Sequence, residues 1–304
     1  MPRTRPHTVI VICGPTASGK TDLAIRAAER FDTAVISADS RQCYREMTIG
    51  TAKPGEEELA RVHHYFINSH SVAAPVNAGV FEQLALGYAS EIFAGRDTAI
   101  LCGGTGLYVR AFSEGIDQMP SIPEEVRLRV RELYQTLGLE AFRELVRRQD
   151  PLFYESGENK NPHRLMRALE VREATGHSIL TYRKGIQRPR EFRTVKVGLQ
   201  WPREELTHRI ETRVHRMIAA GLVEEVRSLI PFRGTPPLDT VGYPEIFRYL
   251  DGEISLDEAT EQITTHTRQY AKRQMTWFRK DAGVTWFDGR YPQQVLEYLL
   301  RENN

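Results

Sequence analysis

The stretch GPTASGKT at residues 14–21 constrains this chain more than any other, and it directly follows an apolar run at residues 8–13. The residues that match the spacing G-x-x-x-x-G-K-[ST] are Gly14, Gly19, Lys20 and Thr21. In this motif the glycines let backbone amides turn toward phosphate oxygens, the lysine adds charge, and the hydroxyl can bind a metal on the phosphates. A glycine-rich turn with a chance lysine is the alternative. The apolar run before the motif predicts a strand, and the amphipathic segment at residues 22–30 after it predicts a helix. This order favours a phosphate-binding loop over a chance turn.

Apolar runs of strand length recur along the chain and alternate with helical patterns. They lie at residues 8–13, 33–38, 98–103 and 195–200. This alternation predicts an α/β fold with a parallel sheet flanked by helices, as in phosphate-loop NTPases. Functional side chains are then expected where the strands end.

A helical segment without strand signals interrupts the sheet pattern. Prolines precede and glycines follow its two helical stretches, at residues 123–137 and 162–175. We therefore expect an inserted all-helical subdomain at residues 121–190, within a core formed by residues 1–120 and 191–304. Its excess of Lys and Arg suits either a solvated surface or a polyanion.

Bulk composition excludes several classes of protein. The chain has 304 residues, and 40% of them are hydrophobic, which is enough to bury a substantial core. Its formal net charge is +1. Three cysteines without C-x-x-C spacing indicate neither a disulfide framework nor a cysteine zinc site. No segment has the length and apolarity of a membrane span, so we expect a cytoplasmic protein.

Asp39 ends the second predicted strand and is the first candidate for chemistry. A carboxylate at this edge would face whatever the phosphate loop holds, as a proton acceptor or as a metal ligand through water. The alternative is an aspartate that caps the next turn.

The third predicted strand ends in Gly103, Gly104 and Thr105, without the metal-binding aspartate of ordinary phosphate-loop NTPases. The two glycines permit close backbone approach, and the Thr105 hydroxyl can donate to a phosphate oxygen. It can equally cap the helix that begins near Leu107.

Two later helical segments carry basic residues at helical spacing. Arg209, Arg213 and Arg216 share a face that is either solvated or stabilises charge on a leaving group. The segment at residues 255–280 carries basic residues near one side, which suits either solvent or nucleic acid. Ser255 is the expected cap of that helix.

The order of motifs resembles the bacterial tRNA dimethylallyltransferase family, also called tRNA isopentenyltransferases, over nearly the whole chain. The collinear motifs are GPTASGKT, ISADSRQCY, IGTAKP, VHHYFI, GGTGLYVRAF, NPHRLMRALEV, RIETRVHRM, TVGYPE and TRQYAKRQMTWFRK. The resemblance implies a transferase that modifies tRNA. A dimethylallyl group would pass from dimethylallyl diphosphate to the exocyclic amine of the adenosine 3′ of the anticodon, in tRNAs reading codons that begin with U.

The resemblance also implies roles for individual residues. Asp39 would be the general base, Thr105 and Arg213 would contact the diphosphate near the breaking bond, and Thr21 with Mg²⁺ would neutralise the leaving group. The diphosphate would be bound by Gly14, Pro15, Thr16, Ala17, Ser18, Gly19, Lys20 and Thr21. The expected contacts with the tRNA anticodon stem-loop are Asp39, Ser40, Arg41, Gln42, Thr105, Arg127, His163, Arg164, Leu165, Met166, Arg167, Val241, Gly242, Tyr243, Lys272, Arg273, Gln274, Trp277 and Arg279.

Two positions depart from the family pattern. Pro244 stands where a basic residue is common, and His163 where Gln or Arg is usual, which weakens the transfer of those RNA contacts. A monomer is expected. The alternatives are a small-molecule kinase that binds ATP, an adenylate isopentenyltransferase that acts on free AMP, and an RNA-binding module without catalysis.

Overall fold

The computed structural model describes residues 6–185 and 187–303 and separates into two compact units. The first, here called the sheet unit, comprises Met1–Glu114 and Pro189–Asn304. The second, here called the helical unit, comprises Gly115–Arg188. In the described ranges no helix is both long enough and apolar enough to cross a membrane.

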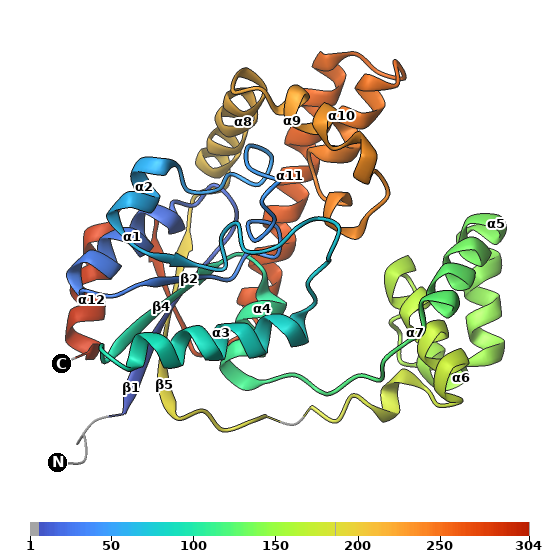
Figure 1. The fold of residues 1–304 in the computed structure, drawn as a ribbon, viewed down its shortest axis with the longest axis horizontal. Helices are drawn as coiled ribbons and strands as arrows, with labels where there is room; N and C mark the ends of the chain where they lie inside the picture. The colour runs from blue at the N-terminus through green and yellow to red at the C-terminus, as the bar shows by residue number, and fades with distance from the viewer. Residues whose placement is uncertain (1–5, 186, 304) are drawn as a thin grey trace. The chain divides into compact units, whose positions relative to one another are not determined.

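The sheet unit holds all six strands (Figure 1). Its first half contains β1 (His7–Cys13), α1 (Lys20–Arg30), β2 (Val35–Ser37), α2 (Glu56–Arg61), β3 (His64–Tyr65), α3 (Ala78–Phe93), β4 (Thr98–Gly103) and α4 (Gly106–Glu114). After the helical unit follow β5 (Phe192–Gln200), α8 (Arg203–Ala219), α9 (Leu222–Ser228), the 3-10 turns η2 (Ile230–Phe232) and η3 (Pro236–Leu238), α10 (Tyr243–Leu250), α11 (Leu256–Phe278), β6 (Val284–Asp288) and α12 (Pro292–Asn303).

The strands form one parallel sheet in the order β3-β2-β4-β1-β5-β6, which confirms the predicted fold class. β1 lies between β4 and β5, with Cys13 opposite Gly103 on one side and Gly198 on the other. The loops that follow β1, β2 and β4 therefore leave the same edge of the sheet. This edge is where ligands bind in open parallel sheets.

Alternate side chains of each strand point into two separate cores. Val9 and Val11 of β1 pack in the larger core, which also includes residues of α3, α4 and α8 to α11. Ile10 and Ile12 pack on the opposite face, together with residues of α1 and α12 (Figure 1). Burial on both faces explains why the strands read as continuous apolar runs.

The helical unit has its own core. It contains α5 (Glu124–Gln149), α6 (Pro151–Glu155), α7 (Pro162–Thr175) and the 3-10 turn η1 (Ile179–Thr181). Val130, Phe142 and Leu165 are completely buried in that core. Gly138 interrupts α5 with φ 70° and ψ 176°, where the sequence predicts the end of a helix.

Two edge strands were not predicted from the sequence. β3 has only two residues, and β6 follows α11 with the short sequence VTWFD. Neither has the length or the alternation that identifies a strand, because each is selected by pairing with a neighbour in the sheet.

Candidate active site

The loop after β1 has the backbone geometry of a phosphate-binding loop. Gly19 lies in the left-handed region at φ 89° and precedes α1, as glycine can without steric cost. Gly14 has φ 142°, and a Cβ there would lie 2.7 Å from the carbonyl oxygen of Leu199 on β5. Both glycines are therefore required by the fold of the loop and by its packing against the sheet.

Several polar groups of this loop have no partner within the chain. The amides of Ala17, Ser18 and Gly19 donate to no acceptor among residues 6–185 and 187–303. The hydroxyl of Ser18 is also buried without a hydrogen bond. Buried polar groups are usually satisfied, so this cluster at the start of α1 suits an anion.

Lys20 supplies the positive charge of the loop. Its Nζ donates to the carbonyl oxygen of Pro15 at 2.6 Å. Burial lowers the pKa of the ammonium to about 8, and nearby Arg213 lowers it further, whereas Asp39 opposes the shift. An anion bound in the loop would favour the charged form of Lys20.

Two arginines of α8 form hydrogen bonds with the phosphate loop. Arg213 Nη1 donates to Thr16 Oγ1 at 3.2 Å, and Arg209 Nε donates to the carbonyl oxygen of Ala17 at 2.7 Å. Burial lowers the pKa of Arg213, with a further contribution from Arg209, and Asp39 opposes it. Arg216, one turn further, is exposed. The predicted arginine face therefore divides into two arginines at the loop and one in solvent.

Trp201 is a partner of the loop that the sequence did not suggest. Its Nε1 donates to the carbonyl oxygen of Ser18 at 2.9 Å, and the Arg209 guanidinium lies 4.1 Å from the centre of its ring. Such a cation–π pair holds Arg209 in place on the outside of the loop.

Asp39 lies at the end of β2, as predicted, and its two oxygens differ. Oδ1 accepts a hydrogen bond from the amide of Arg41 at 2.9 Å, which is the turn-capping role. Oδ2 accepts none from any residue that the structure describes. The charge of Asp39 acts on the pKa values of Lys20, Arg213 and Tyr270, so it belongs electrostatically to the phosphate loop and its surroundings.

Thr105 is bonded to the segment that carries Asp39. Its amide donates to the carbonyl oxygen of Ala38 at 3.2 Å, and its Oγ1 accepts from the amide of Ser40 at 3.1 Å. The hydroxyl thus joins the ends of β4 and β2. Tyr270 of α11 also contacts Thr105, and burial with the Asp39 charge raises the pKa of its phenol to about 12.

Gln274 of α11 joins the phosphate loop to the end of β4. Its Oε1 accepts from the amide of Thr16 at 2.8 Å, and its Nε2 donates to the carbonyl oxygen of Gly104 at 3.0 Å. The side chain is 6% exposed. Both of its polar groups are thus used inside the protein, and the contact of Gln274 with RNA stays a prediction.

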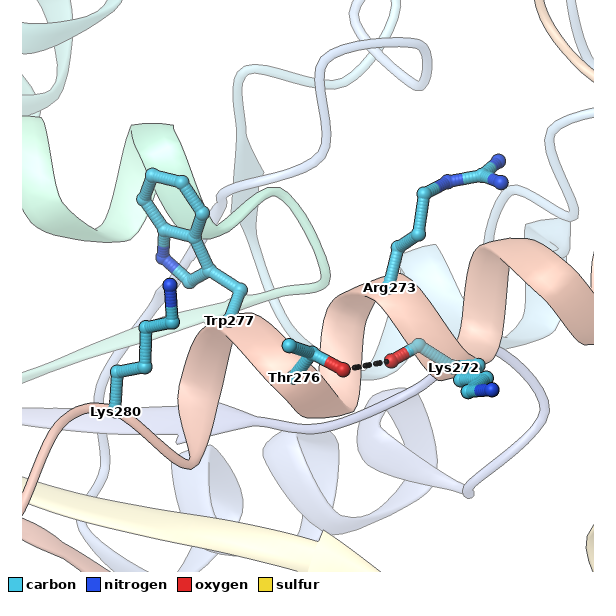
Figure 2. A pocket seen from close by; sticks show the side chains of 5 residues that line it. All are labelled: Lys272, Arg273, Thr276, Trp277 and Lys280. Atoms are coloured by element: carbon cyan, nitrogen blue, oxygen red, sulfur yellow. Dashed lines mark hydrogen bonds between the residues drawn. The ribbon is translucent and has the colours of Figure 1, made fainter. Parts of the chain in front are cut away.

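The other residues of α11 and its end that are predicted to bind RNA are exposed. Figure 2 shows Lys272, Arg273 and Trp277 projecting from the helix, beside Thr276 and Lys280, around a shallow depression. The Trp277 side chain is 37% exposed and packs over Gly106, where a Cβ would overlap the indole ring. Arg279 is exposed at the end of α11.

Residues 241–243, which are predicted to contact RNA, make contacts within the protein. Tyr243 is completely buried, and its hydroxyl donates to Glu225 Oε1 at 2.8 Å. Val241 packs on the large core, and the Gly242 amide donates to Glu245 at 2.8 Å. The contact between RNA and Tyr243 stays a prediction, for a residue whose side chain is used in the core. Pro244 occupies the first turn of α10, a position that proline favours.

The segment at residues 39–42 is only partly available. Gln42 Nε2 donates to the carbonyl oxygens of Thr51 and Ala52, and its Oε1 accepts from Ser37 Oγ at 3.2 Å. The side-chain amide of Gln42 therefore holds the loop at residues 51–52 in place. Ser40 and Arg41 are half-buried.

The predicted contacts on the helical unit fall into three groups. Arg127 on α5 and His163 at the start of α7 are exposed. Arg164 pairs with Glu158 at 3.4 Å, and Arg167 pairs with Glu170 at 3.1 Å. Leu165 is completely buried, and Met166 packs on the same core. The RNA contact of Leu165 stays a prediction, and its side chain lies on the buried face of α7.

The site offers few protein ligands to a metal. No group of three or more His, Cys, Asp or Glu residues that could hold an ion occurs within residues 6–185 and 187–303. Thr21, in the first turn of α1, supplies a hydroxyl next to the amides that suit an anion. This donor set fits Mg²⁺, which usually takes one or two protein ligands together with phosphate oxygens.

Comparison with known proteins points to one family. The sequence profile of IPP transferases matches residues 42–281. The chain is 44% identical over 289 residues to a tRNA dimethylallyltransferase of Cytophaga hutchinsonii, covering 95% of this chain and 94% of that protein. It is 41% identical to a tRNA dimethylallyltransferase of Bacteroides thetaiotaomicron, covering 97% and 96%.

Solved structures agree with this relationship. The tRNA isopentenylpyrophosphate transferase of Bacillus halodurans superposes with a TM-score of 0.71 at 33% identity, covering 97% of this chain and 96% of that one. A eukaryotic dimethylallyltransferase acting on tRNA has the same fold, with a TM-score of 0.72 at 23% identity, covering 93% and 74%. The chain belongs to the IPP transferase family.

Proposed function

We propose that this protein transfers a dimethylallyl group from dimethylallyl diphosphate to the exocyclic amine of the adenosine 3′ of the anticodon, in tRNAs reading codons that begin with U. The family and its named relatives support prenyl transfer to tRNA. The observation that carries the proposal is a continuous set of hydrogen bonds. It runs from Thr16 through Gln274 to Gly104, and from Thr105 to Ser40, next to Asp39.

The phosphate loop would hold the donor by its diphosphate. The unpartnered amides of Ala17, Ser18 and Gly19 suit its oxygens, while Lys20 and Arg213 supply charge. Diphosphate is already a good leaving group, so its stabilisation and the positioning of the allylic carbon carry most of the catalysis.

Asp39 would act as the general base. The lone pair of the adenine amine forms the new N–C bond as the C–O bond to diphosphate breaks, and the bonding pair leaves with the diphosphate oxygen. The proton of the amine passes to Oδ2 of Asp39, which no described residue occupies. Thr105 would hold the end of β4 against this segment.

Thr21 would hold a divalent ion, Mg²⁺ in our proposal, together with the diphosphate. When bound, the ion offsets the negative charge that develops on the leaving group. We place the remaining contacts with the diphosphate on the phosphate loop, on Arg213 of α8 and on Thr105.

The acceptor adenosine would leave the stack of the anticodon loop to reach Asp39, at a cost of about a few kcal/mol. The exposed Lys272, Arg273 and Trp277 offer basic and aromatic contacts to such a loop. Arg127 and His163 would add contacts from the helical unit. We further propose that the protein acts as a monomer in the cytoplasm.

The test combines purified protein, Mg²⁺, labelled dimethylallyl diphosphate and an unmodified anticodon stem-loop with three consecutive adenosines. Mass analysis of the RNA should find one added five-carbon unit on the adenosine 3′ of the anticodon. Preferential prenylation of AMP would favour an adenylate isopentenyltransferase. Transfer of the γ-phosphate of ATP to any product, without prenylation, would favour a kinase.

A further inference from the structure

Gln274 is a buried polar side chain in a helix whose outer face is basic. Gln274 lies on the buried side of α11, and only 6% of its surface is exposed. A buried amide is costly unless its donor and acceptor are both satisfied. Here each group has one backbone partner, at Thr16 and Gly104.

The two partners belong to the two loops that the chemistry requires. Thr16 lies in the middle of the phosphate loop, and Gly104 immediately precedes Thr105. A Cβ on Gly104 would lie 2.2 Å from Gln274 Nε2, so the absence of a side chain there admits the amide. Gln274 therefore spans a gap that no backbone hydrogen bond closes between these two residues.

The hydrogen bond to Thr16 also directs one amide of the phosphate loop. The Thr16 amide points at Gln274, and the Thr16 hydroxyl accepts from Arg213. The amides of Ala17, Ser18 and Gly19 remain without described acceptors. Fixing Thr16 from both sides thus leaves the next three amides oriented for the anion.

We propose that Gln274 is a positioning residue, which holds the phosphate loop in register with Thr105 so that diphosphate binds tightly and the donor is aligned with Asp39. The inference rests on the proposed function only where turnover is measured, because diphosphate binding reports on the loop directly. An exposed RNA contact at this position would instead affect RNA affinity.

The first experiment titrates inorganic diphosphate with Mg²⁺ by calorimetry into wild type, Gln274→Met and the matched control Gln269→Met, an exposed glutamine of the same helix. Methionine keeps the length of the side chain and removes both hydrogen bonds. We expect roughly tenfold weaker diphosphate binding for Gln274→Met, from the loss of buried hydrogen bonds. The control should match wild type, and stem-loop affinity without donor should stay within about twofold in both variants.

The variant Gln274→Glu supplies a second measurement, the pH dependence of diphosphate affinity, which a change in packing alone would not alter. Its carboxylate can accept from Thr16 but cannot donate to Gly104 unless it is protonated. Diphosphate affinity relative to wild type should therefore recover as the pH falls toward 5. This comparison also serves if Gln274→Met fails to fold.

Unchanged diphosphate affinity in Gln274→Met, or a ratio for Gln274→Glu that does not vary with pH, would overturn the proposal. Loss of stem-loop affinity with diphosphate binding intact would make Gln274 an RNA contact instead. If wild type prenylates no RNA while diphosphate binding still depends on Gln274, the proposed function fails and the positioning role stands.

Discussion

Asp39 shows that two roles considered as alternatives can belong to one side chain. Its Oδ1 caps the turn through the amide of Arg41, and its Oδ2 remains without a described donor. The turn fixes the carboxylate, and a fixed carboxylate is a better base than a mobile one because less reorganisation is needed at the transition state.

Asp39→Asn separates these roles. Asparagine can still accept from the Arg41 amide but cannot take a proton, so we expect turnover to fall about 100- to 10,000-fold while stem-loop affinity is retained. Single-turnover rates at saturating donor and filter binding of the stem-loop would measure both. Asp32→Asn, at the exposed end of α1, is the matched control and should keep the wild-type rate. A loss confined to RNA binding would contradict the role of base.

The lowered pKa of Lys20 leads us to expect that donor affinity depends on pH. With its pKa lowered to about 8 in the free protein, Lys20 carries charge below that pH and loses it above. A bound diphosphate raises that pKa, so donor affinity is fully present below pH 8 and falls above it, by about tenfold between pH 7 and pH 9. The dissociation constant of dimethylallyl diphosphate without RNA would report this fall. Lys20→Met should bind weakly at both values, and a dependence that survives in this variant would exclude Lys20 as its source.

The same residue also affects folding. Because the pKa of Lys20 lies below its value of 10.5 in an unfolded chain, its burial costs stability at neutral pH. That cost falls as the pH rises from about 8 toward 10.5, where only the unfolded state still binds the proton.

At the scale of elements, α11 has two functional faces. Gln274 bonds to Thr16 of the phosphate loop, whereas Lys272 and Trp277 line a depression together with Arg273, Thr276 and Lys280 (Figure 2). The exposed aromatic ring between basic side chains suits unstacked bases and phosphates of a single-stranded RNA loop.

Lys272→Met tests the outer face. We expect weaker stem-loop binding and a slope of log affinity against log salt that is smaller by about 0.7–1, because one phosphate contact is lost. Diphosphate affinity should not change. Thr276→Ala, on the same face without a charge, is the control for the slope. An unchanged slope in Lys272→Met would leave the lysine as a solvated surface residue.

Glu225 of α9 joins three elements. Its carboxylate accepts from the amides of Thr48, Ile49 and Gly50 at 2.9, 2.6 and 3.0 Å, and from the hydroxyl of Tyr243 on α10. The contact explains why the loop after Asp39 is ordered against α9.

Glu225→Ala should lower the free energy of unfolding by about 2–4 kcal/mol, since four donors lose their acceptor. Denaturant unfolding would measure the loss, and Tyr243→Phe should reproduce only part of it. The neighbouring exposed Glu224→Ala should change stability little. Equal stability of the Glu225 and Glu224 variants would show that the carboxylate does not hold the loop.

At the scale of the whole molecule, the two units bury separate cores. The buried residues of the helical unit form a cluster distinct from both clusters of the sheet unit. A defect in one core should therefore leave the other unit folded.

Leu165→Ala tests this independence. Removing a completely buried leucine should destabilise the helical unit by about 2–5 kcal/mol. Hydrogen exchange should rise within residues 115–188, with diphosphate binding unchanged and prenylation of the stem-loop reduced. Leu128→Ala, an exposed leucine of α5, is the control. Faster exchange around the phosphate loop in Leu165→Ala would show that the two cores are coupled.

Local patterns in the sequence determine much of the sheet unit. The spacing of GPTASGKT specified a strand, a loop and a helix, because those glycines permit backbone angles that other residues avoid. The apolar runs specified four of the six strands, since strands buried on both faces need no polar alternation. Ser255 specified the start of α11 through its capping box with Glu258.

Only the tertiary structure decided which face of each helix is buried and what its polar groups bind. Gln274 and Lys272 stand two positions apart in one motif, yet one bonds to Thr16 and the other faces solvent. Tyr243 is likewise buried by contacts with a distant segment of the chain. Local sequence sets backbone preference, whereas the partners of a buried polar group come from elements that are remote in sequence and meet only when the chain has folded.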